Sequence, residues 1–347
     1  MFYVEGNQSV YLYQQHKIKV FLENIQKKEE VLIAYHGAAA GEISALYMLL
    51  YLRKERKIKD IHLYNFAELR LKEFEELKKI IKKKKIDKLI ILEGFSLPEY
   101  YAEFNDFAIN IDSHFNDKEP IATFLNPISA KFTPVPSTCL VVYDLLKEYI
   151  PEKYKWLAAI GSIMDYNSEA ASRIIEDEID KVKKLPDIRY TFWCCQYIQK
   201  WGDKIIEKLY ENPSISVLEK DKELIKRRDK FLKKINEHIE EIKSKYKKGP
   251  IYYEVISDEF RLTSPLASFL LDIYPDKLIF VVEKFKDSDI VRISARYRNP
   301  EVNLGKISQK LAKNFNETDA IGYKETVSFR THKKYVKKIF DTLSKYC

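Results

Sequence analysis

The chain has 347 residues, of which 46% are hydrophobic and 32% charged, so it is long enough for two domains and is not a disordered polypeptide. Its 60 basic and 52 acidic residues give a formal net charge of +8, which is compatible with a nucleic-acid partner but equally typical of a heat-adapted protein surface. The four cysteines have no metal-ligand or disulfide-framework spacing, and neither a signal pattern nor a run of ~18 apolar residues is present. We therefore expect a cytoplasmic protein that does not enter a membrane.

The first predicted elements lead to a turn made of small residues. An amphipathic helix at residues 17–28 is followed by the apolar strand 31–35, a turn at residues 36–41 and a helix at residues 42–53. Proteins of the α/β class bind ligands just beyond the carboxyl ends of their strands, so this turn is a candidate site. It contains a histidine but no carboxylate, hydroxyl or thiol, and that absence is the main functional clue in the sequence.

Strands and helices then alternate up to residue 164. The predicted strands cover residues 60–65, 89–92, 107–111 and 121–125, and the predicted helices cover residues 67–84, a short segment after Pro98, residues 139–149 and residues 154–164. This alternation predicts a mostly parallel sheet with helices on both faces. Ser137 is the predicted N-cap of the helix at 139–149. The lysine run 82–85 is interpreted as a solvated helix end rather than a nucleic-acid patch.

The second half of the chain begins with helices only. Residues 169–248 read as helical throughout, with a long charged spacer helix at 221–247 that Gly249-Pro250 ends. Beyond it, strands at 251–256, 278–282 and 290–296 and helices at 266–273, 306–314 and 333–343 predict a small α/β domain. The predicted organisation is therefore a domain at 1–185, a helical connector at 186–248 and a second domain at 249–347.

Five side chains suited to metal coordination lie at the ends of predicted elements. They are His36, Glu93, Asp112, His114 and Asp165. A parallel sheet would bring most of them to one edge, where carboxylates and imidazoles suit a divalent metal. Taken alone, each is more often a turn residue or a cap than a ligand.

The order and spacing of these residues resemble the DHH phosphoesterase superfamily, and in particular its RecJ-type single-strand exonucleases. In that family the first turn reads His-x-Asp-Ala-Asp-Gly, whereas residues 36–41 read His-Gly-Ala-Ala-Ala-Gly here and are followed by Ser44-Ala45 as in the family. The second strand-end aspartate of the family corresponds to Glu93, and its Asp-His-His motif corresponds to Asp-Ser-His at 112–114. Its Gly-x-Ile-x-Asp helix end corresponds to residues 161–165.

The last domain resembles the DHHA1 domain of the same family. Residues 292–296 and 302–305 match its characteristic strand and the segment that follows, but its Gly-Gly-His-x-x-Ala-Ala-Gly signature keeps only Ala320 and Gly322. The resemblance thus implies a DHH domain, a helical linker and a smaller DHHA1-like domain. It also makes four residues candidates for single-stranded DNA binding, although pairing of the arginines with nearby acids is an equally good interpretation. These residues are Arg292, Ser294, Arg296 and Arg298.

The departures from the family motifs affect the residues that would hold metal. Ala38 and Ala40 stand where the family has aspartates, and Ser113 stands where it has a histidine. Two-metal hydrolysis needs carboxylates to hold both cations around an activated water, and alanine supplies neither charge nor oxygen. The remaining groups would hold at most one weakly bound Mn²⁺ or Mg²⁺. We therefore predict a pseudo-nuclease with no catalytic residues and no required cofactor.

A RecJ-like chain that keeps the fold but lacks catalytic residues implies a scaffold role. Such chains in archaea and eukaryotes resemble the cell-division-cycle subunit of the CMG replicative helicase, which joins GINS to the MCM ring. We therefore expect a thermophilic archaeal replication protein that binds GINS and, through it, supports MCM activation. Two alternatives stay open: a residual metal-dependent phosphoesterase acting on single-stranded DNA, and a single-strand-binding module without a helicase partner.

Overall fold

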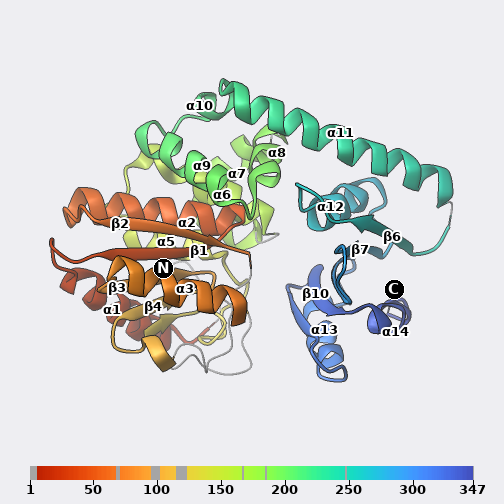
Figure 1. Cartoon of the computed structure of the whole chain (residues 1–347), viewed down its shortest axis with the longest axis horizontal. Coiled ribbons are helices and arrows are strands. Elements are labelled where there is room, and N and C mark those ends of the chain that lie inside the picture. Colours follow the sequence, from red (N-terminus) through yellow and green to blue (C-terminus); the bar gives the residue numbers. More distant parts are fainter. Residues whose placement is uncertain are drawn as a thin grey trace. The chain divides into compact units, whose positions relative to one another are not determined.

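The computed structural model describes residues 6–67, 71–94, 102–114, 123–165, 168–183, 186–246 and 248–346 (Figure 1). The chain divides into two compact units, Met1–Ile225 and Lys226–Cys347. The predicted fold class is confirmed: the first unit holds a parallel sheet, helices follow, and the second, shorter unit holds a sheet of its own. The division falls inside the predicted connector 186–248, and the predicted outer boundaries stay predictions.

The sheet of the first unit is parallel throughout, in the strand order β2-β1-β3-β4-β5. Its strands are β1 (Val31–His36), β2 (Ile61–Phe66), β3 (Lys88–Leu92), β4 (Ala108–Ile111) and β5 (Thr123–Leu125). The run from Val31 to Tyr35 is fully buried, as expected for a strand with helices on both faces. Because all five strands run the same way, their carboxyl ends meet at one edge.

Helices cover this sheet and fill the remainder of the first unit. They are α1 (Gln8–Asn24), α2 (Ala39–Leu50), α3 (Leu71–Lys84), α5 (Thr138–Leu146), α6 (Lys155–Met164), α7 (Ser168–Lys183), α8 (Pro186–Cys195), α9 (Gln199–Glu211) and α10 (Ile215–Glu219), with short helices at Tyr51–Glu55, Ala102–Phe104 and Glu152–Tyr154. Helix α3 packs Phe74 and Leu77 into a cluster with Leu32 and Leu89 of the sheet. Helix α2 is buried along its whole length, which explains why it is apolar on all sides rather than amphipathic.

The turn between β1 and α2 depends on close backbone approach. A Cβ on Gly41 would lie 2.0 Å from the carbonyl oxygen of His36, and a Cβ on Gly37 would lie 2.1 Å from the side-chain oxygen of Asn65. Only glycine therefore lets α2 begin immediately after the strand.

The second unit has a mixed sheet in the order β6-β7-β8-β10-β9, in which only β6 and β7 are parallel to each other. Its strands are β6 (Ile251–Ile256), β7 (Ile279–Lys284), β8 (Ile290–Arg296), β9 (Asp319–Gly322) and β10 (Thr326–His332). Its helices are α11 (Lys222–Lys245, which begins in the first unit), α12 (Thr263–Ile273), α13 (Leu304–Ala312) and α14 (Val336–Leu343). A short helix at Lys333–Tyr335 precedes α14. Along β8, Val291, Ile293 and Ala295 enter the core with α13 and α14. The intervening residues of β8 point to the opposite face.

Several element boundaries differ from those predicted. Helix α1 begins at Gln8, nine residues before the predicted start, because Asn7 accepts a hydrogen bond from the Val10 amide and caps it. Strands β9 and β10 were not predicted. The short helix expected after Pro98 falls mostly on residues outside those described. Within the described part of the chain, no helix is long and apolar enough to cross a membrane.

Candidate functional site

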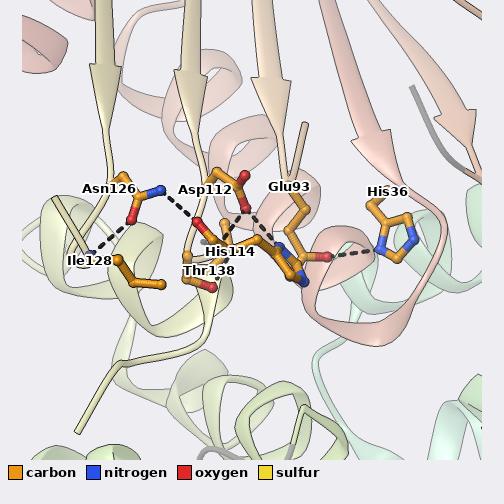
Figure 2. Close-up of polar contacts among 8 residues, drawn as sticks. His36, Glu93, Asp112, His114, Asn126, Ile128 and Thr138 are labelled. Atoms are coloured by element: carbon orange, nitrogen blue, oxygen red, sulfur yellow. Dashed lines mark hydrogen bonds and ion pairs between the residues drawn. The ribbon is translucent and has the colours of Figure 1, made fainter. Parts of the chain in front are cut away.

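The carboxyl edge of the first sheet brings together the side chains expected there (Figure 2). His36 is the last residue of β1, Glu93 follows β3, and Asp112 follows β4. His114 lies two residues beyond Asp112. Three neighbouring parallel strands thus deliver an imidazole and two carboxylates to one place, as the spacing predicted.

His36 and Glu93 form the first pair of the site. The His36 Nδ1 lies 3.2 Å from the Glu93 Oε2, and the His36 ring also packs against Tyr197, with ring centroids 5.1 Å apart. Glu93 is 1% exposed and has a φ of +60°. A left-handed backbone costs a non-glycine residue of order 1–3 kcal/mol. The position of this buried carboxylate therefore lowers the stability of the folded protein.

Asp112 and His114 form the second pair. The Asp112 Oδ1 lies 2.8 Å from the His114 Nδ1 and accepts the His114 backbone amide at 3.0 Å. Both residues are buried. The tight turn that joins them therefore locks the orientation of the imidazole.

Asp165 supplies a third carboxylate from a different element. It is the residue at which α6 ends, and its amide donates to the Gly161 carbonyl at 3.0 Å. Part of the residue reaches the surface, but its Oδ2 atom is buried. The Asp165 charge raises the pKa of His114, and the charges of Glu93, His114 and Asp112 in turn act on the pKa of Asp165.

Burial dominates the electrostatics of the cluster. Burial raises the pKa of Glu93 to about 7, with the His114 cation opposing and the Asp112 charge adding to the shift. Burial, followed by the Glu93 charge, also holds the pKa of Asp165 well above its usual range. Burial alone would lower the pKa of His114, but the charge and hydrogen bond of Asp112 outweigh it and raise that pKa to about 9. At neutral pH the cluster therefore contains an imidazolium among carboxyl groups, one of which is near half-protonated.

The three positions that lack the family's ligands lie beside this cluster. Ala38 occupies the N-cap position of α2 and makes no side-chain cap, while Ala40 is fully buried in the first turn of the helix. The Ser113 hydroxyl lies 3.0 Å from the Thr138 Oγ1. The first turn of α2 thus contributes small apolar side chains, and Ser113 contacts another hydroxyl.

Two supporting residues were not among the predicted site residues. Asn126 follows β5, donates to the His114 carbonyl at 2.8 Å and accepts the Ile128 amide at 2.9 Å (Figure 2). The backbone N–H of Asn126 donates to the Gln14 Oε1 at 3.2 Å. The strand-end rule that identified Asp112 would also have identified Asn126. Thr138 lies in a helix and had no such signal.

Ser137 occupies the predicted N-cap position of α5, but its side chain makes no capping hydrogen bond. Its hydroxyl lies 2.7 Å from the Ser162 Oγ and 3.2 Å from the Cys139 Sγ. The hydroxyl therefore links α5 to α6 beside the cluster instead of capping its own helix.

The cluster has donor atoms of the kind that the predicted metal site requires. One oxygen each of Glu93, Asp112 and Asp165 is buried without a hydrogen-bond partner, and carboxylate oxygens are the ligands that hard divalent cations prefer. Among the described residues, however, no group of three or more His, Cys, Asp or Glu side chains is arranged to hold a metal ion. The donor types fit a divalent cation, but their arrangement does not.

Three of the candidate DNA-binding residues, Arg292, Ser294 and Arg296, lie on the α12 face of β8, and Arg298 follows the strand. Arg292 lies 3.2 Å from the buried carboxylate of Glu283, which also accepts a hydrogen bond from Thr263. Arg296 is 4% exposed and donates to the Ser264 hydroxyl and to two backbone carbonyls. Much of the hydrogen-bonding capacity of these two arginines is thus directed into the unit.

The other two candidates differ in exposure. The Ser294 side chain is buried. Arg298 is half-exposed and lies 3.7 Å from Glu325 and 3.8 Å from Asp272. Arg292 and Arg298 therefore both pair with nearby acids, as the alternative interpretation of the arginines expects.

No protein-family profile and no curated protein sequence matches the chain. Solved structures do resemble it. The DHH domain of a member of a ribosomal-protein family has a TM-score of 0.70 at 12% identity, covering 100% of this chain and 93% of its own. RecJ from Thermus thermophilus in complex with Mn²⁺ has a TM-score of 0.67 at 12% identity, covering 96% of this chain and 54% of its own. An exonuclease RecJ bound to manganese has a TM-score of 0.59 at 13% identity, covering 96% and 94%.

The chain therefore spans about half the length of the Thermus RecJ that it resembles. All three identities lie far below the level at which activity can be transferred between proteins. What they share with this chain is the arrangement of its elements, over almost its entire length. The chain has the RecJ-like fold of DHH-domain proteins.

Proposed function

We propose that this chain is a non-catalytic RecJ-like scaffold subunit of an archaeal replicative helicase, which binds GINS and supports MCM activation. The observation that carries the proposal is the first turn of α2. Ala38 and Ala40 stand there beside the buried carboxyl groups, at the positions where the RecJ-type motif has carboxylates. A site built for two metal ions needs those charges.

The packing of α2 supports the same proposal. A Cβ added to Gly161 would lie 3.3 Å from the Cα of Ala40 and 2.4 Å from the Cys139 sulfur. The first turn of α2 therefore packs closely against α6 at Ala40 and Gly161, beside Cys139 of α5, and its small side chains allow that contact. A fold that keeps its packing while lacking ligands is suited to assembly with other proteins.

Calorimetric titration of the full chain with a purified archaeal GINS complex tests the proposal. We expect binding at micromolar concentration or tighter, unaffected by EDTA. Absence of binding in this range contradicts the scaffold role. Incubation of labelled single-stranded DNA with the chain and Mn²⁺ should leave the DNA intact.

A second candidate is a residual metal-dependent phosphoesterase acting on single-stranded DNA. The buried carboxylate oxygens of Asp112 and Asp165 without hydrogen-bond partners favour it, because an oxygen buried without a partner costs free energy that a coordinated cation would offset. Its ligands would come from His36, Asp112, His114 and Asp165. Cleavage that depends on Mn²⁺ and is lost in His114→Ala, but kept in the exposed-site control Lys82→Ala, would establish it and overturn the scaffold proposal.

A further inference from the structure

Helix α1 exposes an unusual amount of apolar surface. Of the eight large hydrophobic side chains that are exposed in the described part of the chain, four lie on this one helix. They are Val10 at 36%, Leu12 at 52%, Tyr13 at 59% and Val20 at 39% exposure. Single exposed apolar residues are ordinary, but a cluster of them marks an interaction surface.

The inner face of α1 is firmly attached to the first unit. Tyr11 packs edge-on against Phe132 with ring centroids 4.8 Å apart, and Ile18 and Leu22 are almost fully buried. The Gln14 side chain donates to the Ser129 hydroxyl at 2.8 Å and accepts the Asn126 amide at 3.2 Å. The outer face is therefore presented on a rigid support, which lowers the entropy that a partner must overcome.

Three of the four exposed apolar side chains, Leu12, Tyr13 and Val20, form a stripe along the helix, and Val10 lies outside it. Leu12, His16 and Val20 are spaced by four residues, and Tyr13 and Val20 by seven, so at 100° per residue they share the side opposite the buried residues. Lys17 and Lys19 project on either side of this stripe, and both are exposed. This is the pattern of one helix prepared to pack against another, with charges flanking an apolar seam.

The lysines beside the stripe indicate the charge of the partner that would bind there. Helix α1 carries two lysines beside this stripe and a single acidic residue, Glu23, three residues beyond Val20, and no described acid lies within ion-pair distance of Lys17 or Lys19. The ammonium of Lys17 lies over the Tyr13 ring at 4.7 Å instead. A second copy of this chain would bring like charges together across the seam, which is destabilising. An acidic partner would offset them.

We propose that the outer face of α1 is a docking site for an amphipathic helix of another protein whose apolar stripe is flanked by Asp and Glu. Leu12, Tyr13 and Val20 supply the apolar contact, and Lys17 and Lys19 supply the flanking charge. The site is independent of the carboxylate cluster and of whether GINS is a partner.

A synthetic 21-residue helical peptide with a leucine seam flanked by glutamates is the probe, labelled for fluorescence anisotropy. We expect the acidic peptide to bind the full chain at least about tenfold more tightly than the same seam flanked by lysines. Leu12→Ser/Tyr13→Ser should weaken binding of the acidic peptide about tenfold or more. Lys17→Glu/Lys19→Glu should reverse the preference between the two peptides.

Matched variants away from α1 serve as controls. Ile256→Ser removes a side chain that is 76% exposed on β6, and Lys82→Glu/Lys83→Glu reverses two exposed charges on α3. Neither should change peptide binding. Equal binding of both peptides, or equal weakening by the control variants, overturns the proposal. So does sedimentation velocity that shows a dimer dissociating on Leu12→Ser/Tyr13→Ser, because the face would then pair with its own copy.

Discussion

At the scale of single residues, the carboxylate cluster is a set of buried groups whose charges depend on one another. Glu93 combines full burial, a left-handed backbone and a pKa of about 7. His114 combines burial with a pKa of about 9. Both pKa values lie above the ordinary values of their side chains, and both therefore link folding stability to pH in the same direction.

Glu93→Gln should make stability less dependent on pH. The folded state binds the Glu93 proton more tightly than the unfolded state, so its contribution is complete below about pH 4.5 and is lost as the pH rises through about 7. Between pH 4.5 and 7 the variant should gain up to about 3 kcal/mol relative to the parent, at about 1.4 kcal/mol per pKa unit. Urea denaturation at several pH values measures this, and parallel stability curves for the two proteins would contradict it. The exposed-site variant Glu55→Gln serves as the control.

At the scale of elements, sequence pattern and observed structure agree where hydrophobic runs are unambiguous. Strand β6 and strand β8 occur where predicted, because their runs are apolar or strictly alternating. Strand β10, Thr-Val-Ser-Phe-Arg-Thr-His, was missed because three hydroxyls and an arginine hide the alternation. The contact between His36 and Glu93 could not be predicted, since it depends on the left-handed backbone of Glu93 and on strand order.

Ala38→Ser should stabilise the first unit. Ala38 occupies the N-cap position of α2 without capping it, and a serine there can accept a hydrogen bond from the first turn. Such caps are worth about 1 kcal/mol relative to alanine. Urea denaturation should show a gain of this size, whereas Ala45→Ser inside the buried helix should show a loss. An unchanged midpoint for Ala38→Ser would mean that the first turn is satisfied in another way.

Gly41→Ala should be much more damaging than Gly37→Ala in the same turn. The added methyl would strike the backbone carbonyl of His36 in the first case, but the movable side chain of Asn65 in the second. We expect Gly41→Ala to cost more than about 2 kcal/mol and Gly37→Ala clearly less. Thermal denaturation of both variants compares them directly, and similar losses would contradict the expectation.

At the scale of the whole molecule, the positive charge is unevenly divided. Residues 226–347 contain 27 basic and 17 acidic residues, whereas residues 1–225 contain 33 and 35. The entire basic surplus thus belongs to the second unit. The overall net charge of +8 does not show this division, because it sums the charges of the two units.

Charge reversal in the second unit should therefore weaken retention on heparin more than the same change in the first. Lys334→Glu/Lys337→Glu/Lys338→Glu changes exposed lysines in and beside α14, and Lys82→Glu/Lys83→Glu/Lys84→Glu changes exposed lysines at the end of α3. Both variants alter the net charge equally, so their elution salt concentrations compare the two local fields. Equal shifts would show that the polyanion contacts both units alike.

The connection through Asn126 gives the molecule a natural spectroscopic reporter. The Gln14 side chain on α1 accepts a hydrogen bond from the backbone N–H of Asn126. The Asn126 side chain in turn donates to the backbone carbonyl of His114. An event on the helix is thus only two hydrogen bonds from the backbone carbonyl of His114, whose imidazole pKa the charge and hydrogen bond of Asp112 raise to about 9. The proton resonances of His114 should shift when a ligand engages α1, so NMR can follow occupancy of the surface without an added label.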